Sequence, residues 1–195
     1  MTTLYARWVA VLLLVAVAGG VGYWYYLPLR STAPRWSIYS EVTNKFSIQY
    51  PPDFSVTNDY TYTLLGPGRE IHGVAFTVPP SMTAGTNLSS DTKISVEYLN
   101  DATCTAASFL DNGQPLPSPT DSVYSFDVKT TTGAAAGNRY EEIVYALSDC
   151  KAIRYFIHYG VIENYDPGAV REFDRAQLQN IFDSIRKSFI EDRRG

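Results

Sequence analysis

The side chains that could do chemistry are few in this chain, and they lie far apart. The sequence holds two cysteines, Cys104 and Cys150, and two histidines, His72 and His158. A cysteine thiolate beside a histidine can act as a nucleophile, and the carboxylates of segment 160–170 could complete such a site. One hypothesis is therefore an enzyme whose site is assembled in three dimensions from His158, Cys104 and those carboxylates.

The spacings that mark known catalytic and metal sites do not occur. The sequence has no Gly-rich phosphate loop, no Gly-x-Ser-x-Gly elbow and no histidine pair with zinc-ligand spacing. Glu141 and Glu142 are adjacent in a predicted strand, so they face opposite sides and cannot act as a paired acid and base. Oxygens of Glu163, Asn164 and Asp166 could meet a calcium ion, but EF-hand spacing is missing. We predict no catalytic residue, no metal and no cofactor.

The two cysteines favour a structural explanation. They are the only thiols of the chain, and in an oxidising compartment such a pair persists as a disulfide. A bridge between Cys104 and Cys150 would close a loop of about 46 residues, for which the chain-entropy estimate is about 4 kcal/mol.

A long apolar stretch begins close to the N-terminus. No charged residue lies between Arg7 and Arg30, and about 20 apolar residues match the roughly 30 Å of a bilayer core. The aromatic run 23–26 fits the interfacial belt of a span. We predict a transmembrane anchor from Trp8 to Leu27. The alternative is a cleaved signal peptide, because residues 16–18 have the small-x-small spacing of a cleavage site.

A short N-terminal tail before a single span favours a cytoplasmic N-terminus. The predicted organisation is a cytoplasmic tail (1–7), the anchor (8–27), a linker (28–35), one extracytoplasmic domain (36–190) and a tail (191–195). We expect the protein in the cell membrane, with its domain facing the periplasm or the cell exterior. The net charge of −4 and the pI near 5.1 argue against a nucleic-acid partner.

Alternating apolar residues predict strands at 45–50, 72–78 and 93–99, and a meander of three strands at 122–131, 139–147 and 151–159. Segment 79–91 and the Pro-rich segment 114–121 are expected to be loops.

Two helices are expected. A short one is predicted within 101–113, with Thr103 or Asp101 as its N-cap. The other spans 174–189, where apolar residues recur at helical spacing, Asp174 and Gln177 form a capping box, and Phe173 can pack onto Leu178. Antiparallel strands followed by a packed helix indicate an α+β fold with a central antiparallel sheet.

Residues 46–54, FSIQYPPDF, resemble the opening of PsbP-like domains, and the helix end IRKSF at 185–189 is similar to the end of that family. The chain also looks like membrane-anchored proteins of bacterial envelopes. The resemblance implies an α/β/α sandwich around an antiparallel sheet, used as a non-catalytic binding or assembly module.

The leading hypothesis is a membrane-anchored, non-enzymatic binding or assembly domain outside the cytosol. Its contact surfaces for a protein partner are predicted in the loops 79–91, 111–121 and 160–170. The envelope enzyme is the alternative, and a ligand carrier with an apolar cavity under the sheet is a third hypothesis.

Overall fold

The computed structural model describes residues 35–101, 103–147 and 149–192. They belong to one unit of the chain, Arg35–Gly195. The predicted cytoplasmic tail, the predicted span from Trp8 to Leu27 and all but the last residue of the predicted linker lie outside the described residues. In the part of the chain that is described, none of the helices is long and apolar enough to cross a membrane.

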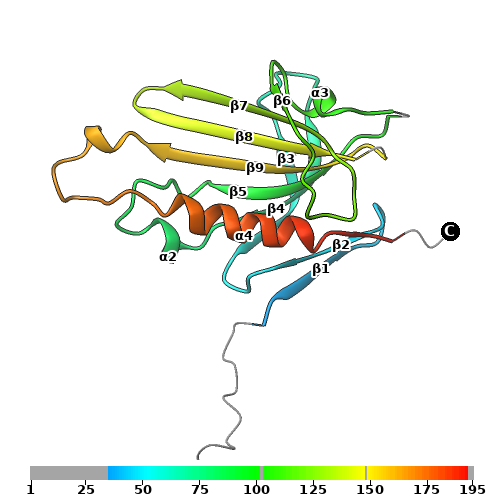
Figure 1. The fold of residues 1–195 in the computed structure, drawn as a ribbon, viewed down its shortest axis with the longest axis horizontal. Coiled ribbons are helices and arrows are strands. Elements are labelled where there is room, and N and C mark those ends of the chain that lie inside the picture. The colour runs from blue at the N-terminus through cyan, green and yellow to red at the C-terminus, as the bar shows by residue number, and fades with distance from the viewer. Residues whose placement is uncertain (1–34, 102, 148, 193–195) are drawn as a thin grey trace, which may run out of the picture. The chain divides into compact units, whose positions relative to one another are not determined.

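A seven-stranded antiparallel sheet is the main element of the fold (Figure 1). In spatial order its strands are β3 (Ser55–Tyr62), β4 (Ile71–Thr77), β5 (Lys93–Tyr98), β9 (Lys151–Gly160), β8 (Asn138–Ala146), β7 (Asp127–Ala135) and β6 (Gln114–Leu116). The predicted meander is therefore present as β7, β8 and β9, and the predicted strands before it are present as β4 and β5.

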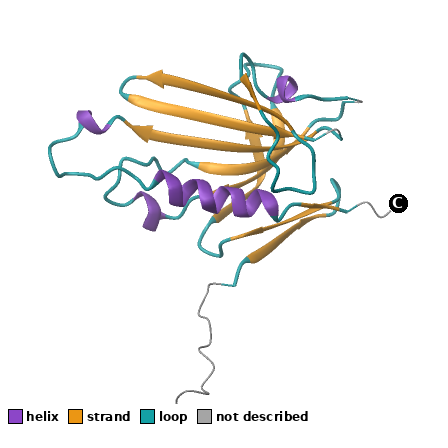
Figure 2. Cartoon of the chain, viewed as in Figure 1, coloured by secondary structure: helices purple, strands orange, loops and turns teal. Residues whose placement is uncertain are grey.

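A smaller sheet and a few helices complete the fold (Figure 2). The smaller sheet has the order β1 (Ser37–Glu41), β2 (Phe46–Tyr50), β10 (Ile190–Glu191), and β10 includes a residue that the sequence analysis placed in the C-terminal tail. The helices are α2 (Pro80–Thr83), α3 (Ala106–Phe109), the 3-10 turn η1 (Ile162–Asn164) and α4 (Arg175–Lys187). The described domain is mostly antiparallel sheet with a few helices.

Alternation along the strands sorts the side chains onto the two faces of the large sheet. On β5, Ile94 and Val96 point to one face, and Ser95 and Glu97 point to the other. The register places Val96 between Val74 of β4 and Ile153 of β9, which gives the first face a continuous apolar centre.

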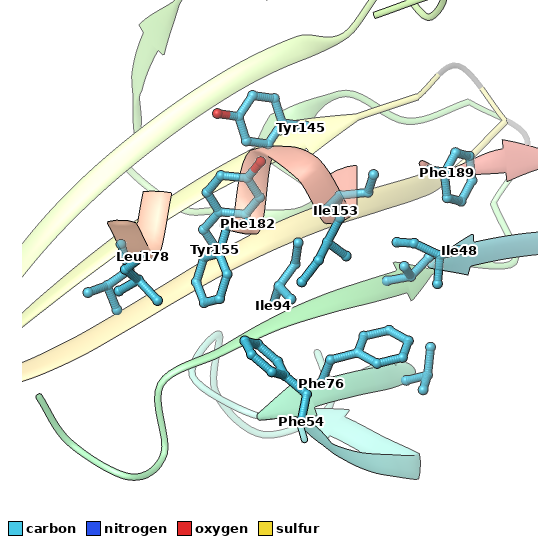
Figure 3. Close-up of a cluster of buried hydrophobic side chains, with 14 of the residues drawn as sticks. Ile48, Phe54, Phe76, Ile94, Tyr145, Ile153, Tyr155, Leu178, Phe182 and Phe189 are labelled. Atoms are coloured by element: carbon cyan, nitrogen blue, oxygen red, sulfur yellow. The ribbon is translucent and has the colours of Figure 1, made fainter. Parts of the chain in front are cut away.

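The first face packs against α4 (Figure 3). Leu178, Phe182 and Ile185 of α4 are fully buried, and Asp174 caps the helix by accepting a hydrogen bond from the Gln177 backbone N–H (2.9 Å). The predicted C-terminal helix is thus confirmed with its cap. The same core includes strand residues of both sheets, which are Phe46, Ile48, Phe76, Ile94, Tyr145, Ile153 and Tyr155, together with Phe54 and Phe189 next to strands β3 and β10.

The second face packs against α3. Phe109 and Ala106 of this helix are fully buried against Tyr62 of β3, Val144 of β8 and Ala152 of β9. The helix is a single turn, shorter than the sequence predicts, and its N-cap is Thr105 instead of Thr103 or Asp101. Ser108 Oγ accepts a hydrogen bond from the Thr105 backbone N–H (3.3 Å), so a local capping motif fixes the start of the turn.

Three other differences from the sequence analysis concern segments without a clear pattern. Segment 79–91 contains the single-turn helix α2. The Pro-rich segment 114–121, expected to be a loop, contains the short edge strand β6. Pro115 is tolerated in this strand because an edge strand pairs on one side only. Strands β1, β3 and β10 were not predicted. β3 has a bulge between Thr57 and Tyr60, which breaks the alternation that identifies a strand.

Candidate functional site

A buried arginine lies at the centre of the second sheet face. Arg154 of β9 has no exposed side-chain surface, and its Nε and Nη2 each lie 2.8 Å from an oxygen of Glu97 on β5. Its Nη1 donates to Glu142 Oε2 of β8 at 2.6 Å. Burial alone would lower the pKa of Arg154, but the surrounding anionic groups, Glu97 first among them, outweigh it and raise the pKa. The cation is therefore held permanently charged.

The same guanidinium connects the sheet to its neighbours. Arg154 Nη2 also donates to the backbone oxygen of Phe109 in α3 (2.6 Å), and its carbon Cζ lies 3.6 Å from the ring centre of Tyr62 on β3. The Tyr62 hydroxyl donates to Glu142 (2.8 Å). These hydrogen bonds connect β3 and α3 to the sheet, and a buried polar network whose members are all hydrogen-bonded makes the structure around it rigid.

Beyond the cluster that α3 covers, the second face has an aromatic and cationic surface. We call it the open face, and it is formed by Tyr60, Lys93, Tyr140, Phe156 and His158. Phe156 belongs to neither hydrophobic cluster of the domain. Its ring contacts the other members of the open face instead, at 6.1 Å from Tyr140 and 6.3 Å from His158 between ring centres.

Lys93 lies over two rings of this surface. Its ammonium nitrogen is 4.8 Å from the ring centre of Phe156 and 5.7 Å from that of Tyr60, and it donates to the backbone oxygen of Asp91 (3.1 Å). Burial lowers the pKa of Lys93, against the opposing attraction of Asp91 and of more distant carboxylates. Burial also raises the pKa of Tyr60. The ammonium has three donors, so it can still donate to a bound partner.

A shallow pocket of about 200 Å³ opens at this lysine. Its walls come from β3, from the start of β5 and from β9, and are formed by Tyr60, Thr61, Tyr62, Thr63, Leu64, Asp91, Lys93 and Phe156. A second pocket, of about 370 Å³, lies at the small sheet and is lined by Ser40, Glu41, Val42, Lys45, Phe46, Ser47, Ile190, Glu191 and Asp192.

His158 stands at the other end of the open face. Its Nδ1 lies 2.7 Å from Asp91 Oδ1, and its ring stacks on Tyr140 with a centre-to-centre distance of 4.3 Å. Its Nε2 is buried and has no hydrogen-bond partner among the described residues. The predicted placement of His158 on one face with Arg154 and Phe156 is confirmed, and the contacts of the ring are those of a packed, hydrogen-bonded residue.

The residues of the enzyme hypothesis are not brought together. Cys104 and Cys150 form the expected disulfide, with Cα atoms 5.0 Å apart, so neither sulfur is available as a thiolate. Cys150 precedes β9 and His158 lies eight residues further along it, which at roughly 3.3 Å per residue is a separation of about 26 Å. His72 is exposed and lies near Thr61 Oγ1 (3.3 Å).

The carboxylates of segment 160–170 remain on the surface. Glu163 and Asp166 are both exposed, and Asn164 uses its side-chain amide to donate to Gly137 (3.3 Å). Among the described residues, no group of three or more His, Cys, Asp and Glu side chains could hold a metal ion. Glu141 and Glu142, on opposite faces as predicted, bond to Arg175 and to Arg154 respectively.

Two of the three predicted contact loops adjoin each other. Asn87 in segment 79–91 donates from Nδ2 to the Gly160 backbone oxygen (2.8 Å) and accepts at Oδ1 from the Phe173 backbone N–H (2.9 Å). Segment 111–121 is elsewhere, since it includes β6 and ends at Asp121, which contacts Arg186 of α4.

The open face was missed by the sequence analysis, although the alternation in strand 151–159 placed Phe156 and His158 on one side.

Comparisons with known proteins give one distant likeness. No family model matches the chain, and no curated protein matches it. The chain is similar to the solution structure of cyanobacterial PsbP (CyanoP) from Synechocystis sp. PCC 6803, with a TM-score of 0.39 and 13% sequence identity over 83% of this chain and 95% of that one. The weak resemblance to PsbP-like domains expected from the sequence is confirmed by this likeness.

Proposed function

We propose that this chain is a membrane-anchored, extracytoplasmic binding or assembly domain without enzymatic activity, and that it contacts a protein partner through the open face. The observation that carries the proposal is the arrangement of Lys93 over Phe156 and Tyr60, at a shallow pocket that these three residues line. Phe156 is buried and Tyr60 is partly buried, and aromatic rings beside a desolvated cation are typical of the residues that dominate protein interfaces.

The rigidity of this surface supports a binding role. Tyr60, Lys93 and Phe156 come from three different strands. On the same face, the buried pairs of Arg154 with Glu97 and Glu142 join β9 to β5 and β8, and Tyr62 of β3 packs on the Arg154 guanidinium. A surface whose side chains are already fixed loses little conformational freedom when a partner binds. Asp91 belongs to the predicted contact loop 79–91, so that loop forms the rim of the same surface.

The compartment is supported by two features. The apolar segment 8–27 is long enough for a membrane span, and a disulfide such as that of Cys104 and Cys150 persists in an oxidising compartment. N-terminal sequencing of the membrane-extracted protein tests the anchor. We expect the original N-terminus, and a new terminus at Gly19 would show that the segment is a cleaved signal peptide.

Quantitative co-purification from native membranes tests the binding function. Tyr140→Ala removes a ring of the open face, and Val123→Ala is the matched control because Val123 is 94% exposed on a different segment. We expect the amount of co-purified partner to fall at least tenfold for Tyr140→Ala and to stay unchanged for Val123→Ala. Equal recovery with both variants would contradict the proposed surface.

The alternative hypothesis, an envelope enzyme, requires residues that the described structure keeps apart. Its residues, His158, Cys104 and the carboxylates of loop 160–170, lie apart in the described structure, and Cys104 is bonded to Cys150. An activity that depended on both His158 and Cys104 would therefore require a different arrangement of the chain.

A further inference from the structure

We propose that the outer edge of β7, over residues 131–135, is a docking site at which an extended segment of a protein partner adds to the sheet as a further antiparallel strand. This inference goes beyond the binding function proposed above. It concerns a backbone edge of the sheet that shares Tyr140 with the open face, and it does not depend on the membrane anchor or on Lys93, Tyr60, Phe156 and His158.

The edge exists because β6 is shorter than β7. β6 pairs with β7 only from Val128 to Thr130, whereas β7 continues to Ala135. In the described part of the chain, no strand lies on the outer side of residues 131–135 (Figure 1). Half of one side of a nine-residue strand is therefore bare.

The hairpin that follows β7 determines which backbone groups are free. β7 and β8 are joined by the two residues Ala136 and Gly137, both with positive φ (48° and 83°), as a type I′ turn requires. In such a hairpin the flanking pair, Ala135 and Asn138, exchanges both of its hydrogen bonds.

Every second residue of β7 then bonds to β8, and the residues between them point away. Thr132 and Ala134 therefore direct N–H and C=O groups outward, in line with Val128 and Thr130, which face β6. The position of Pro115 is consistent with this assignment. Pro115 lies opposite Lys129, whose backbone groups bond to β8, so β6 needs no N–H group toward β7 at this position. The free edge offers two donors and two acceptors.

This edge lacks the devices that protect other strand edges from pairing. Edge strands are commonly blunted by charge, proline or a bulge. β3, at the opposite edge of the sheet, has a bulge between Thr57 and Tyr60 and carries Asp59. β6 has Pro115. In contrast, residues 131–135 read TTGAA, with no charge and no proline, and their pairing with β8 continues without a register shift.

A second copy of this chain does not fit the edge. If two β7 edges paired so that Thr132 met Ala134 in both directions, Ala136 of one copy would lie opposite Thr130 of the other. Gln114 of β6 already occupies that place. A single extended segment has no turn at this point and can pair with both Thr132 and Ala134, so the occupant is a segment of another protein.

The neighbouring side chains define the chemistry of that segment. On one face Gly133 lies opposite Tyr140, so an added residue beside Gly133 can reach the Tyr140 ring and should be apolar. On the other face Ala134 lies opposite Arg139, which is exposed, so an acidic residue can reach its guanidinium over the small alanine. The preferred segment alternates apolar and acidic or polar residues.

Amide NMR of the full chain in detergent micelles tests the site, with the acetylated and amidated hexapeptide Glu-Val-Thr-Val-Glu-Tyr as the probe. In the free protein, we expect the Thr132 and Ala134 amides to exchange with solvent at least tenfold faster than those of Thr131 and Gly133. Saturating peptide should slow the exchange of Thr132 and Ala134 and leave that of Gly133 unchanged.

Edge variants separate backbone pairing from side-chain effects. Thr132→Pro removes an outward N–H without removing a bond to β8, and should weaken peptide binding at least tenfold. Thr132→Val keeps the N–H and should change binding less than threefold. Ala134→Pro repeats the test at a second outward position, should Thr132→Pro fail to fold. The proposal would be overturned by slow exchange of both outward amides in the free protein, by peptide shifts located away from β7, by no binding at millimolar peptide, or by equal losses in the proline and valine variants.

Discussion

Arg154 and Glu97 form a two-pronged ion pair in which both side chains are completely buried, with each of the two N···O distances at 2.8 Å. The pair joins β9 to β5 in the middle of the sheet. Glu142 of β8 takes a third N–H of the same guanidinium, so three adjacent strands share one cation.

Removing that cation should destabilise the domain strongly. Arg154→Met leaves Glu97 and Glu142 without a partner, and breaking a buried pair costs about 3 to 5 kcal/mol. Arg175→Met is the matched control, because Arg175 pairs with Glu141 at the surface with 46% of its side chain exposed, and such pairs contribute about 0 to 1 kcal/mol. Urea unfolding of both variants measures the two costs, and similar values would show that the Arg154 network does not stabilise the sheet.

The packing of α4 gives a second prediction. Phe182 is fully buried in the main core, so Phe182→Ala should lower the free energy of unfolding by about 3 to 5 kcal/mol through lost transfer energy and the cavity left behind. Gln179→Ala, at an exposed position of the same helix, should change it by about 0.5 kcal/mol or less. A loss below about 1 kcal/mol for Phe182→Ala in a denaturant titration would count against the packing of this helix.

The disulfide between Cys104 and Cys150 should be detectable both in the number of free thiols and in the free energy of unfolding. Protein from its native membrane, unfolded without reductant, should take up no alkylating reagent at Cys104 or Cys150, and its intact mass should remain that of the bridged chain. The Cys104→Ser/Cys150→Ser variant should lose about 4 kcal/mol of unfolding free energy, because the bridge closes a loop of 46 residues. Two freely alkylated cysteines would refute the bridge.

Asp121 makes the attachment of α4 dependent on pH. Hydrogen bonds from Lys187 and Arg186 lower the pKa of Asp121, so its native pKa lies below that of the unfolded chain, which is about 3.9. Its contribution to stability is then present above the unfolded pKa and is lost as the pH falls through the native pKa. Because Asp121 is 41% exposed, we expect Asp121→Asn to cost at most about 1 kcal/mol at pH 7. Thermal unfolding of both proteins should give a difference that shrinks toward pH 3, and a difference that grew there would contradict the assignment.

Local patterns in the sequence predicted the elements that depend on local interactions. The helix α4 was predicted because its apolar spacing and its Asp174 cap lie within a single segment. The meander was predicted because β7, β8 and β9 follow one another across short turns. The alternation in β9 also placed Arg154, Phe156 and His158 together on one face. In these cases the neighbours in the sequence are also the neighbours in the structure.

The features that were missed depend on pairing between distant segments. Glu97 meets Arg154 across 57 residues, and Tyr60 joins Lys93 only through the order of β3, β4 and β5 in the sheet. The order of the strands in the sheet sets those contacts. The alternation within one strand shows which face a side chain occupies, but it does not identify the distant strand that lies beside it. Strand β3 itself was missed because its bulge disturbs the alternation, and α3 was predicted too long because its cap at Thr105 starts the helix later than the apolar spacing indicates.

Site-specific photocrosslinking in native membranes shows whether a partner protein contacts the open face. Benzoylphenylalanine placed at Tyr140 reports on the open face, and the same group at Val123 is the control for an exposed position elsewhere. We expect one discrete protein adduct from position 140 that disappears with Lys93→Glu, and no such adduct from position 123. No adduct from position 140, an adduct that persists with Lys93→Glu, or the same adduct from both positions would contradict a partner-binding role for the open face.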